Sequence, residues 1–366
     1  MIFISGGGTG GHLFPALTIS EHLMNIGYDI TFIGSKHGME ANFLQNKNIN
    51  IKLLDIHGIQ RNFSLKSIYK NLFFPIKFMK SYIQSRQLIQ ELKPVIIIGT
   101  GGYSSGLPLL AAIHLKIPTL IQDQNSVPGL ITRKLHKYIN TICIAYSNFH
   151  ISDKYKNIVL TGNPIRSNLK VTDRQKALIK LKLSPNKKTI LVLGGSQGSK
   201  PINKHIINNI QYYLKNNIQI IWQSGEKNYN DIPKHIKDNQ NITIKEFYKD
   251  MSKVYSAADV VISRAGALAI SELIFMGKLF ILIPFKYAAD NHQEINANYI
   301  SNNKACLKIN EDDLHKGILE KNIYDLLHND TIIQKIKNNI KIINKPDATQ
   351  KIINEITKII DIQNAK

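Results

Sequence analysis

Short apolar runs rich in β-branched residues alternate along the chain with stretches of helical periodicity. In the first half, the runs that we expect to form strands are 2–5, 29–33, 51–56, 95–98, 119–121 and 141–144. In the second half they are 189–193, 219–222, 242–246, 260–263 and 280–283. Continuous apolar strands that alternate with helices are typical of parallel sheets covered on both faces. The pattern predicts an α/β fold of two doubly wound, Rossmann-like domains.

A turn-forming stretch separates the two series of strands. Gly162, Asn163 and Pro164 are typical turn residues, so we expect a first domain over 1–162 and a second over 163–345. The last segment, 346–366, has a helical pattern and begins with a proline, which is favoured in the first turn of a helix. We expect this helix to pack back on the first domain.

The charge of the chain is strongly positive. The 366 residues include 47 Lys and Arg against 26 Asp and Glu, a formal net charge of +21. Such an excess suggests nucleic acid, an anionic membrane or an anionic substrate as partner. However, only six of the basic residues are Arg, and the lysines are scattered. Lys, Ile and Asn share A+T-rich codons, so codon drift explains the total charge as well as a polyanionic partner does.

The cysteine count, the apolar runs and the absence of metal-binding motifs argue against secreted, membrane-spanning and metal-dependent classes of protein. Cys143 and Cys306 lie far apart without metal-ligand spacing, which favours a reducing, cytosolic compartment. We expect no signal peptide, and the longest apolar runs, 95–98 and 279–284, have the length of strands rather than of a membrane-spanning helix. The chain has no D-x-D pair, His/Asp cluster or Walker motif, so we expect no metal and no other cofactor.

A glycine-rich segment, 5–12, follows the first expected strand and leads into a helix. Gly6, Gly8 and Gly11 fit the G-x-G-x-x-G pattern of dinucleotide-binding domains. That pattern requires an acidic residue at the end of the second strand to bind the ribose, and the chain has Gly-Ser-Lys at 34–36. A nicotinamide or flavin enzyme is therefore disfavoured, and the segment is interpreted as a helix N-terminus that approaches an anion or a sugar.

Three further loops of small residues follow strands, at 99–106, 194–199 and 263–272. In doubly wound sheets, ligands bind at the carboxyl ends of the strands, where the following helices begin. Four such loops in two domains predict a cleft lined by helix N-termini, which suits a pyrophosphate without a metal ion.

Nine segments, in order along nearly the whole chain, resemble those of a family of peptidoglycan glycosyltransferases. They are GGTGGHLFPA at 7–16, GTGGYSSG at 99–106, QDQN at 122–125, GNPIR at 162–166, LGGSQGS at 193–199, FYKDM at 247–251, SRAGALAISE at 263–272, DNHQEINA at 290–297 and PDAT at 346–349. Members of this family move N-acetylglucosamine from its UDP form to undecaprenyl-pyrophosphoryl-muramoyl-pentapeptide, forming a β-1,4-linked disaccharide. The resemblance implies glycosyltransferase family 28 and its GT-B fold, in which two Rossmann-like domains face a cleft.

The resemblance also implies a role for each matched residue. The residues that would face the donor sugar or the acceptor are Thr9, Gly10, Gly11 and Asn125. Arg166, Ser196 and backbone groups around Tyr248 would hold the UDP part of the donor. The helix that would present its N-terminus to the phosphates begins with Ala267, Leu268, Ala269, Ile270, Ser271 and Glu272. Glu272 would accept hydrogen bonds from two ribose hydroxyls, and Gln293 would bind sugar hydroxyls.

The implied reaction is a direct displacement with inversion, in which a base takes the proton of the acceptor hydroxyl while UDP leaves. His12 is the first candidate for the base, because a helix N-terminus keeps a histidine neutral. Alternatively, His12 caps the helix or binds the sugar. Asp123, which stands where the family has Glu, is the second candidate, and the alternative for it is to orient another residue.

Apolar and basic residues are interleaved over 65–82, which suits a surface that dips into an anionic bilayer. Pro75 is expected to divide this segment into two short helices, and the alternative is a helix pair packed on the first domain. The acceptor of the family is lipid-linked, so we expect a peripheral enzyme at the cytoplasmic face of the bacterial inner membrane. The expected partners are UDP-N-acetylglucosamine, the undecaprenyl-linked acceptor and anionic lipid, and not nucleic acid.

Two alternatives remain at this point. Another enzyme of the same fold, such as a glycolipid glycosyltransferase or a UDP-sugar 2-epimerase, would share the UDP site. A basic nucleic-acid-binding module would show strongly salt-dependent binding. The sequence has no aromatic-rich platform or recognition-helix motif in support of the second alternative.

Overall fold

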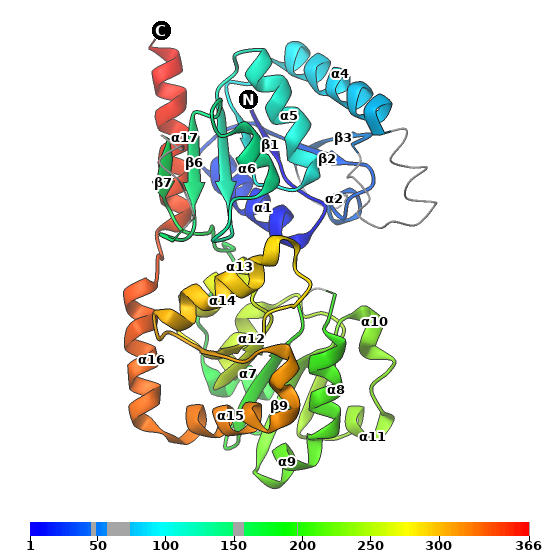
Figure 1. Cartoon of the computed structure of the whole chain (residues 1–366), viewed down its shortest axis with the longest axis vertical. Coiled ribbons are helices and arrows are strands. Elements are labelled where there is room, and N and C mark those ends of the chain that lie inside the picture. The colour runs from blue at the N-terminus through cyan, green and yellow to red at the C-terminus, as the bar shows by residue number, and fades with distance from the viewer. Residues whose placement is uncertain (45–48, 57–73, 149–156, 196, 366) are drawn as a thin grey trace. The chain divides into compact units, whose positions relative to one another are not determined.

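The computed structural model describes residues 1–44, 49–56, 74–148, 157–195 and 197–365. The chain forms two compact units. Unit 1 comprises Met1–Ser167 together with Pro346–Lys366, and unit 2 comprises Asn168–Lys345. Each unit is a parallel sheet with helices packed on it (Figure 1).

Unit 1 contains a seven-stranded sheet with the order β3-β2-β1-β4-β5-β6-β7, and every adjacent pair of strands is parallel. The strands are β1 (Ile2–Ser5), β2 (Ile30–Ser35), β3 (Asn50–Leu54), β4 (Ile97–Gly99), β5 (Thr119–Asp123), β6 (Thr141–Ile144) and β7 (Ile158–Leu160). The helices are α1 (Gly10–Asn25), α2 (Glu40–Phe43), α4 (Phe74–Leu92), α5 (Tyr103–His114), α6 (Leu130–Leu135) and α17 (Ala348–Asn364). Ile2 and Ile4 lie in one core cluster and Phe3 in another, because successive strand residues point to opposite faces.

The C-terminal helix α17 belongs to the core of unit 1. Its residues Ile352, Ile356 and Ile360 are buried in the same cluster as Ile2 and Ile4 of β1. The side chains at these positions lie four residues apart, on one face of the helix. The chain therefore returns to its first unit after it has completed the second (Figure 1).

Residues 163–167 also lie in unit 1, whereas the sequence placed the boundary after 162. The side chain of Asn163 accepts a hydrogen bond from Gln122 at 3.0 Å, and the backbone N–H of Ile165 donates to Thr349 of the C-terminal segment. These contacts attach the segment after Gly162 to the first sheet, so the expected boundary is corrected by five residues, from 162 to 167.

Unit 2 contains a six-stranded sheet with the order β10-β9-β8-β11-β12-β13, again parallel throughout. The strands are β8 (Lys188–Leu193), β9 (Ile218–Gln223), β10 (Ile242–Lys245), β11 (Val260–Ser263), β12 (Leu279–Leu282) and β13 (Leu307–Lys308). The helices are α7 (Arg174–Lys180), α8 (Lys200–Asn208), α9 (Ile210–Lys215), α10 (Glu226–Tyr229), α11 (Lys234–Lys237), α12 (Met251–Ala257), α13 (Ala267–Phe275), η1 (Ala289–Asn291), α14 (His292–Asn302), η2 (Glu311–Lys316), α15 (Ile318–His328) and α16 (Asp330–Ile343). Both sheets follow the Rossmann order, so the predicted fold class is confirmed.

Part of the expected membrane segment forms a single helix. Residues 65–73 lie outside the described residues, and the remainder belongs to α4, which runs without interruption for 19 residues. Pro75 is the second residue of this helix, where it removes no intrahelical hydrogen bond. The expected division of 65–82 at this proline also involves residues 65–73, which lie outside the described residues. In the described part of the chain, no helix is long and apolar enough to cross a membrane.

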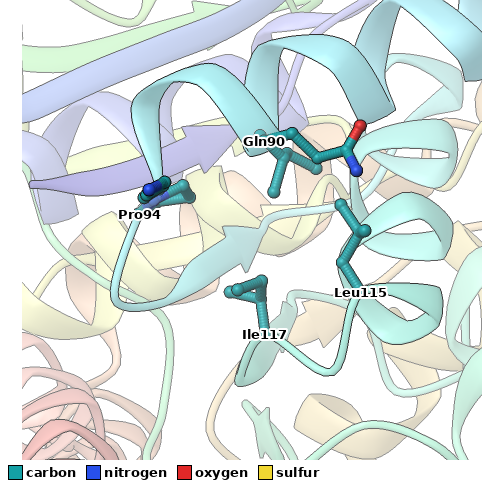
Figure 2. A pocket seen from close by; sticks show the side chains of 6 residues that line it. Gln90, Pro94, Leu115 and Ile117 are labelled. Atoms are coloured by element: carbon teal, nitrogen blue, oxygen red, sulfur yellow. The ribbon is translucent and has the colours of Figure 1, made fainter.

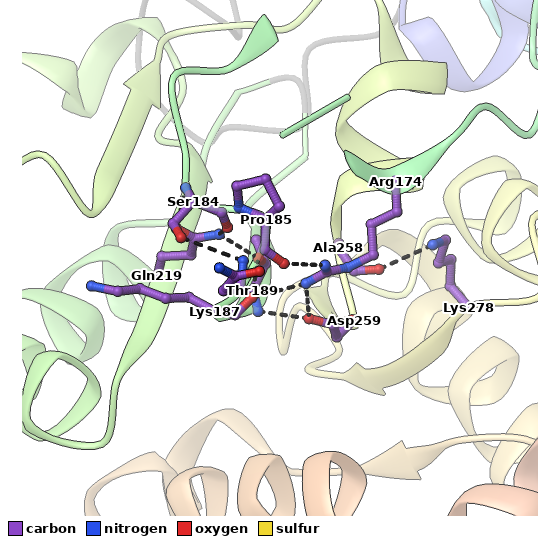
Figure 3. Close-up of polar contacts among 10 residues, drawn as sticks. Arg174, Ser184, Pro185, Lys187, Thr189, Gln219, Ala258, Asp259 and Lys278 are labelled. Atoms are coloured by element: carbon purple, nitrogen blue, oxygen red, sulfur yellow. Dashed lines mark hydrogen bonds and ion pairs between the residues drawn. The ribbon is translucent and has the colours of Figure 1, made fainter. Parts of the chain in front are cut away.

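At the amino edge of the sheet in unit 2, a polar cluster ties strand ends together (Figure 3). The guanidinium of Arg174 donates to Asp259 at 2.8 Å, and the same carboxylate oxygen accepts from the backbone N–H of Thr189. The ammonium group of Lys278 donates to the carbonyl of Ala258 at 3.0 Å. Burial lowers the pKa of Lys278 to about 8, against a partly compensating attraction to Asp259.

Candidate functional site

Three loops at the carboxyl edge of unit 1 are joined through one imidazole. The Nδ1 atom of His12, in the first turn of α1, lies 3.0 Å from the carbonyl of Thr100 and 3.0 Å from Oε1 of Gln124. The hydroxyl of Thr100 donates back to the carbonyl of His12 at 2.6 Å. The loops that follow β1, β4 and β5 are therefore held together at the point where ligands of parallel sheets bind.

These contacts define the tautomer of His12. Both partners of Nδ1 are acceptors, because the amide nitrogen of Gln124 donates to the carbonyls of Thr100 and Gln122. Nδ1 therefore carries the hydrogen, and in the neutral ring Nε2 carries the lone pair. A lone pair at the start of a helix is the feature that a general base at this position requires.

Asp123, the second candidate for the base, is 5% exposed. Its Oδ2 atom accepts hydrogen bonds from the hydroxyl of Thr132 at 2.6 Å and from the backbone N–H of Gly129 at 2.8 Å. Burial raises the pKa of Asp123, and these hydrogen bonds and the charge of His12 oppose that shift. These two hydrogen bonds connect the carboxylate at the end of β5 to the start of α6.

The other predicted residues of unit 1 surround the same loops. Thr9 precedes α1, and its side chain makes no capping hydrogen bond, while Gly10 and Gly11 are the first two residues of the helix. Asn125 lies directly after Gln124 on the loop that follows β5. The guanidinium carbon of Arg166 lies 5.5 Å from the ring centre of Phe14 in α1, so this residue also belongs to unit 1.

The structure adds one residue at this edge that sequence reasoning missed. Glu40 is fully buried, and its carboxylate accepts hydrogen bonds from the backbone N–H groups of Gly8 and Ser35. An acidic side chain therefore does lie at the end of the second strand. It belongs to Glu40 of α2, and it binds backbone N–H groups. The only signal in the sequence was a glycine two positions before it.

In unit 2, the predicted phosphate-binding helix is α13. Its first residue is Ala267, and the preceding Gly266 provides no side-chain cap for the first N–H groups. Glu272, in the second turn, is 6% exposed, and its Oε2 atom accepts a hydrogen bond from the hydroxyl of Tyr255 at 3.0 Å. Tyr255 belongs to α12 and was not predicted, because nothing in the sequence pairs it with Glu272.

Backbone groups near Tyr248 are arranged by Gln223. The side-chain carbonyl of Gln223 accepts from the N–H of Tyr248 at 3.0 Å, and its amide donates to the carbonyl of Gly195. The N–H of Tyr248 donates to Gln223, so the backbone group of Tyr248 that could accept a hydrogen bond from a nucleobase is its carbonyl. Ser196, the predicted contact next to Gly195, lies outside the described residues.

Gln293 and Arg264 hold the loop that follows β12. Oε1 of Gln293 accepts from the backbone N–H of Phe285 at 3.0 Å, which leaves the amide NH2 as the group that could donate to a sugar. Arg264 donates to the carbonyls of Ile283 and Pro284, to the hydroxyl of Ser199 and to the carboxylate of Glu311. The guanidinium therefore connects the loops after β8, β11 and β12.

A pocket of about 370 Å³ lies at the opposite edge of the sheet in unit 1 (Figure 2). It is lined by Ile89, Gln90, Lys93, Pro94, Leu115 and Ile117. These residues precede β4 and β5 or end α4 and α5, so the pocket is separate from the glycine loops. It is largely apolar and contains none of the predicted site residues.

Solved structures of glycosyltransferases share this fold over nearly the whole chain. A crystal structure of Acinetobacter baumannii MurG aligns with a TM-score of 0.75 at 27% identity, covering 98% of this chain and 99% of that one. The glycotransferase of kitacinnamycin aligns with a TM-score of 0.69 at 13% identity over 98% of both chains, which shows the fold alone. The two Rossmann-like units therefore define a glycosyltransferase of the GT-B class.

The sequence comparisons narrow this class to one family. Residues 2–144 match the glycosyltransferase family 28 N-terminal domain, and residues 189–352 match its C-terminal domain. Relatives from Christiangramia forsetii and Bacillus pumilus are 40% and 33% identical, covering 98% of this chain and 98% and 99% of their own. Each is a UDP-N-acetylglucosamine--N-acetylmuramyl-(pentapeptide) pyrophosphoryl-undecaprenol N-acetylglucosamine transferase. The chain belongs to this family of transferases.

Proposed function

We propose that the chain transfers N-acetylglucosamine from UDP-N-acetylglucosamine to the lipid-linked N-acetylmuramoyl-pentapeptide, forming the β-1,4-linked disaccharide precursor of peptidoglycan. The observation that carries this proposal is the full-length similarity to transferases with this one reaction in their names, at up to 40% identity. Other enzymes of the same fold, including a UDP-sugar 2-epimerase, are not favoured by these relatives.

The donor is assigned to unit 2. The uncapped N-terminus of α13 supplies N–H groups and a positive dipole end for the diphosphate. Glu272 lies in the second turn of the same helix, where it accepts hydrogen bonds from the ribose hydroxyls. The carbonyl of Tyr248 accepts from uracil, and the amide of Gln293 donates to the sugar. No metal or other cofactor takes part in this proposal.

The acceptor and the proton transfer are assigned to unit 1. The Nε2 lone pair of His12 takes the proton of the attacking hydroxyl of the muramoyl sugar as the new bond forms at the anomeric carbon. The bond from that carbon to the UDP oxygen breaks at the same time, and the configuration inverts. Thr9, Gly10, Gly11 and Asn125 contact the acceptor or the transferred sugar, and Asp123 keeps the neighbouring loop in place.

Helix α4 supports a peripheral location at the cytoplasmic face of the bacterial inner membrane. Ile76, Met79 and Ile83 follow one face of the helix and are 68%, 55% and 46% exposed. Lys77 and Lys80 lie among them, and basic residues beside exposed apolar ones favour binding to an anionic bilayer. Such a surface would keep the enzyme next to its lipid-linked acceptor.

The direct test supplies labelled UDP-N-acetylglucosamine together with the undecaprenyl-linked muramoyl-pentapeptide. We expect label to appear in the lipid phase and free UDP to be released in equal amount. Label that stays in the nucleotide pool with folded enzyme would refute the transfer. Release of free 2-epimerised sugar without acceptor would support the epimerase, and salt-sensitive DNA or RNA binding that UDP does not compete with would support a nucleic-acid-binding module.

A further inference from the structure

A buried carboxylate lies directly beneath the first glycine loop. Glu40, the first residue of α2, has no exposed surface. Its Oε2 atom accepts from the N–H of Gly8 at 2.8 Å, and its Oε1 atom accepts from the N–H of Ser35 at 2.9 Å. The carboxylate therefore connects the loop after β1 to the end of β2. Among the described residues, no Lys, Arg or His forms an ion pair with it.

The chain makes room for this carboxylate with glycines. A Cβ atom placed on Gly7, Gly34 or Gly38 would overlap the side chain of Glu40. Gly8 itself has a φ of +81° and packs against the ring of Tyr103, so its N–H has a fixed direction. A buried charge is costly unless hydrogen bonds compensate it, and here two backbone donors do so. Such an arrangement constrains the loop more than a core residue of the same size would.

The loop that Glu40 constrains leads directly into the acceptor side of the site. Gly8 precedes Thr9, and the carbonyl of Thr9 accepts from the backbone N–H of His12 at 3.2 Å. The orientation of the first turn of α1 thus depends on the conformation of Gly8. In a dinucleotide-binding domain this space and these N–H groups serve a nucleotide, whereas here the protein's own carboxylate fills them.

We propose that Glu40 is a positioning residue of the transfer reaction, which holds the first glycine loop so that Thr9, Gly10, Gly11 and His12 face the acceptor. This inference rests on the proposed function for its kinetic consequence. Its structural consequence, a loop whose Gly8 N–H is locked to a carboxylate, holds whatever the substrate is.

The test compares Glu40→Gln with the wild type. Glutamine has the same shape, but its amide NH2 opposes one of the two backbone donors, so one hydrogen bond is lost and the other loses its charge. We expect kcat/KM for the acceptor to fall about 10- to 100-fold while the dissociation constant for UDP stays within about twofold. Glu91→Gln, an exposed carboxylate near the end of α4, is the matched control and should change neither value.

A second variant keeps the carboxylate of Glu40 but moves it away from its backbone donors. Gly38→Ala places a methyl group against the carboxylate of Glu40, and we expect the same selective loss on the acceptor side. An acceptor kcat/KM within twofold of the wild type in either variant, with the protein folded, would overturn the proposal. So would an equal loss of UDP affinity, because that would indicate a general loss of structure.

Hydrogen exchange separates this inference from the proposed function. In Glu40→Gln, amide exchange of the peptide 5–12 should be faster than in the wild type, while peptides of unit 2 should not change. If the wild type transfers no sugar, the proposed function fails but this result still supports the locked loop. If exchange of 5–12 is unchanged in a folded Glu40→Gln protein, the positioning role fails, whether or not the enzyme is active.

Discussion

The two units have the same strand order but stabilise their ligand loops with opposite charges. In unit 1, the buried carboxylate of Glu40 accepts from the loop after the first strand. In unit 2, the guanidinium of Arg264 donates to Ser199, which caps the helix after the corresponding strand, and its charge is balanced by Glu311. A carboxylate under a glycine loop disfavours a phosphate there, whereas an uncapped helix N-terminus such as that of α13 favours one. Two units of the same fold can therefore have different roles, one suited to the acceptor and the other to the nucleotide.

The largest effect should follow removal of the base from unit 1. His12→Ala should lower kcat about 10²- to 10⁴-fold, because general base catalysis contributes about that much, and should leave UDP affinity nearly unchanged. Steady-state kinetics with both substrates and UDP titration measure the two effects. His22→Ala, on the same helix, is the control and should retain activity. A kcat close to the wild-type value would remove His12 from the mechanism.

A smaller effect on the other side of the comparison should follow loss of the ribose ligand. Glu272→Ala should raise the donor KM about 10- to 100-fold, because a hydrogen bond to a charged group contributes about 1.5–3 kcal/mol. Donor kinetics at saturating acceptor measure this. Tyr255→Phe, which removes only the hydrogen bond to Glu272, should give a weaker change in the same direction. A donor KM unaffected by Glu272→Ala would contradict the assignment of the donor to unit 2.

The membrane surface of unit 1 should respond to charge reversal. The double variant Lys77→Glu and Lys80→Glu should weaken binding to anionic vesicles about tenfold or more, since each basic residue near the surface contributes about 1 kcal/mol. Co-sedimentation with phosphatidylglycerol vesicles measures the binding. Reversal of Lys180 and Lys227 in unit 2 is the control. Equal loss in both pairs would show that total charge, and not α4, determines membrane binding.

At the amino edge of unit 2, the expected effect is on stability and not on catalysis or binding. The pKa of Lys278 is lowered from 10.5 to about 8 in the folded protein, so between these values the unfolded chain binds the extra proton. Stability should therefore rise with pH across this window, with an upper limit of about 3 kcal/mol, and should not depend on this group below pH 8.

Urea unfolding of the wild type and Lys278→Met from pH 7 to pH 10 measures this dependence, with Lys180→Met as an exposed control. The rise should be absent in Lys278→Met and present in the control. A wild-type profile that is identical to that of Lys278→Met would contradict the pKa assigned to this ammonium group.

Much of the fold follows from the sequence, because long apolar strands in a parallel sheet are continuous in the chain. The expected strand at 2–5 matches β1, whereas β7 (Ile158–Leu160) and β13 (Leu307–Lys308) were missed. These two strands have only three and two residues and lie at the sheet edges, where their side chains are not fully buried.

The glycine loops of the candidate site could be predicted from the sequence, whereas the side chains that hold these loops and Glu272 in place could not. Gly10, Gly11 and His12 could be found because the motif is contiguous. Glu40 could not, since its contact with Gly8 spans 32 positions and depends on the register of β1 with β2. The contact of Tyr255 with Glu272 likewise depends on how α12 and α13 pack, which the pattern of hydrophobic residues does not specify.

The most direct test of this division of labour is a calorimetric titration of UDP into the full-length wild type, Glu40→Gln, His12→Ala and Glu272→Ala. We predict that the dissociation constant of UDP rises about 10- to 100-fold in Glu272→Ala alone and stays within about twofold in the two variants of unit 1. Equal weakening in Glu40→Gln or His12→Ala would contradict the assignment of the nucleotide to unit 2.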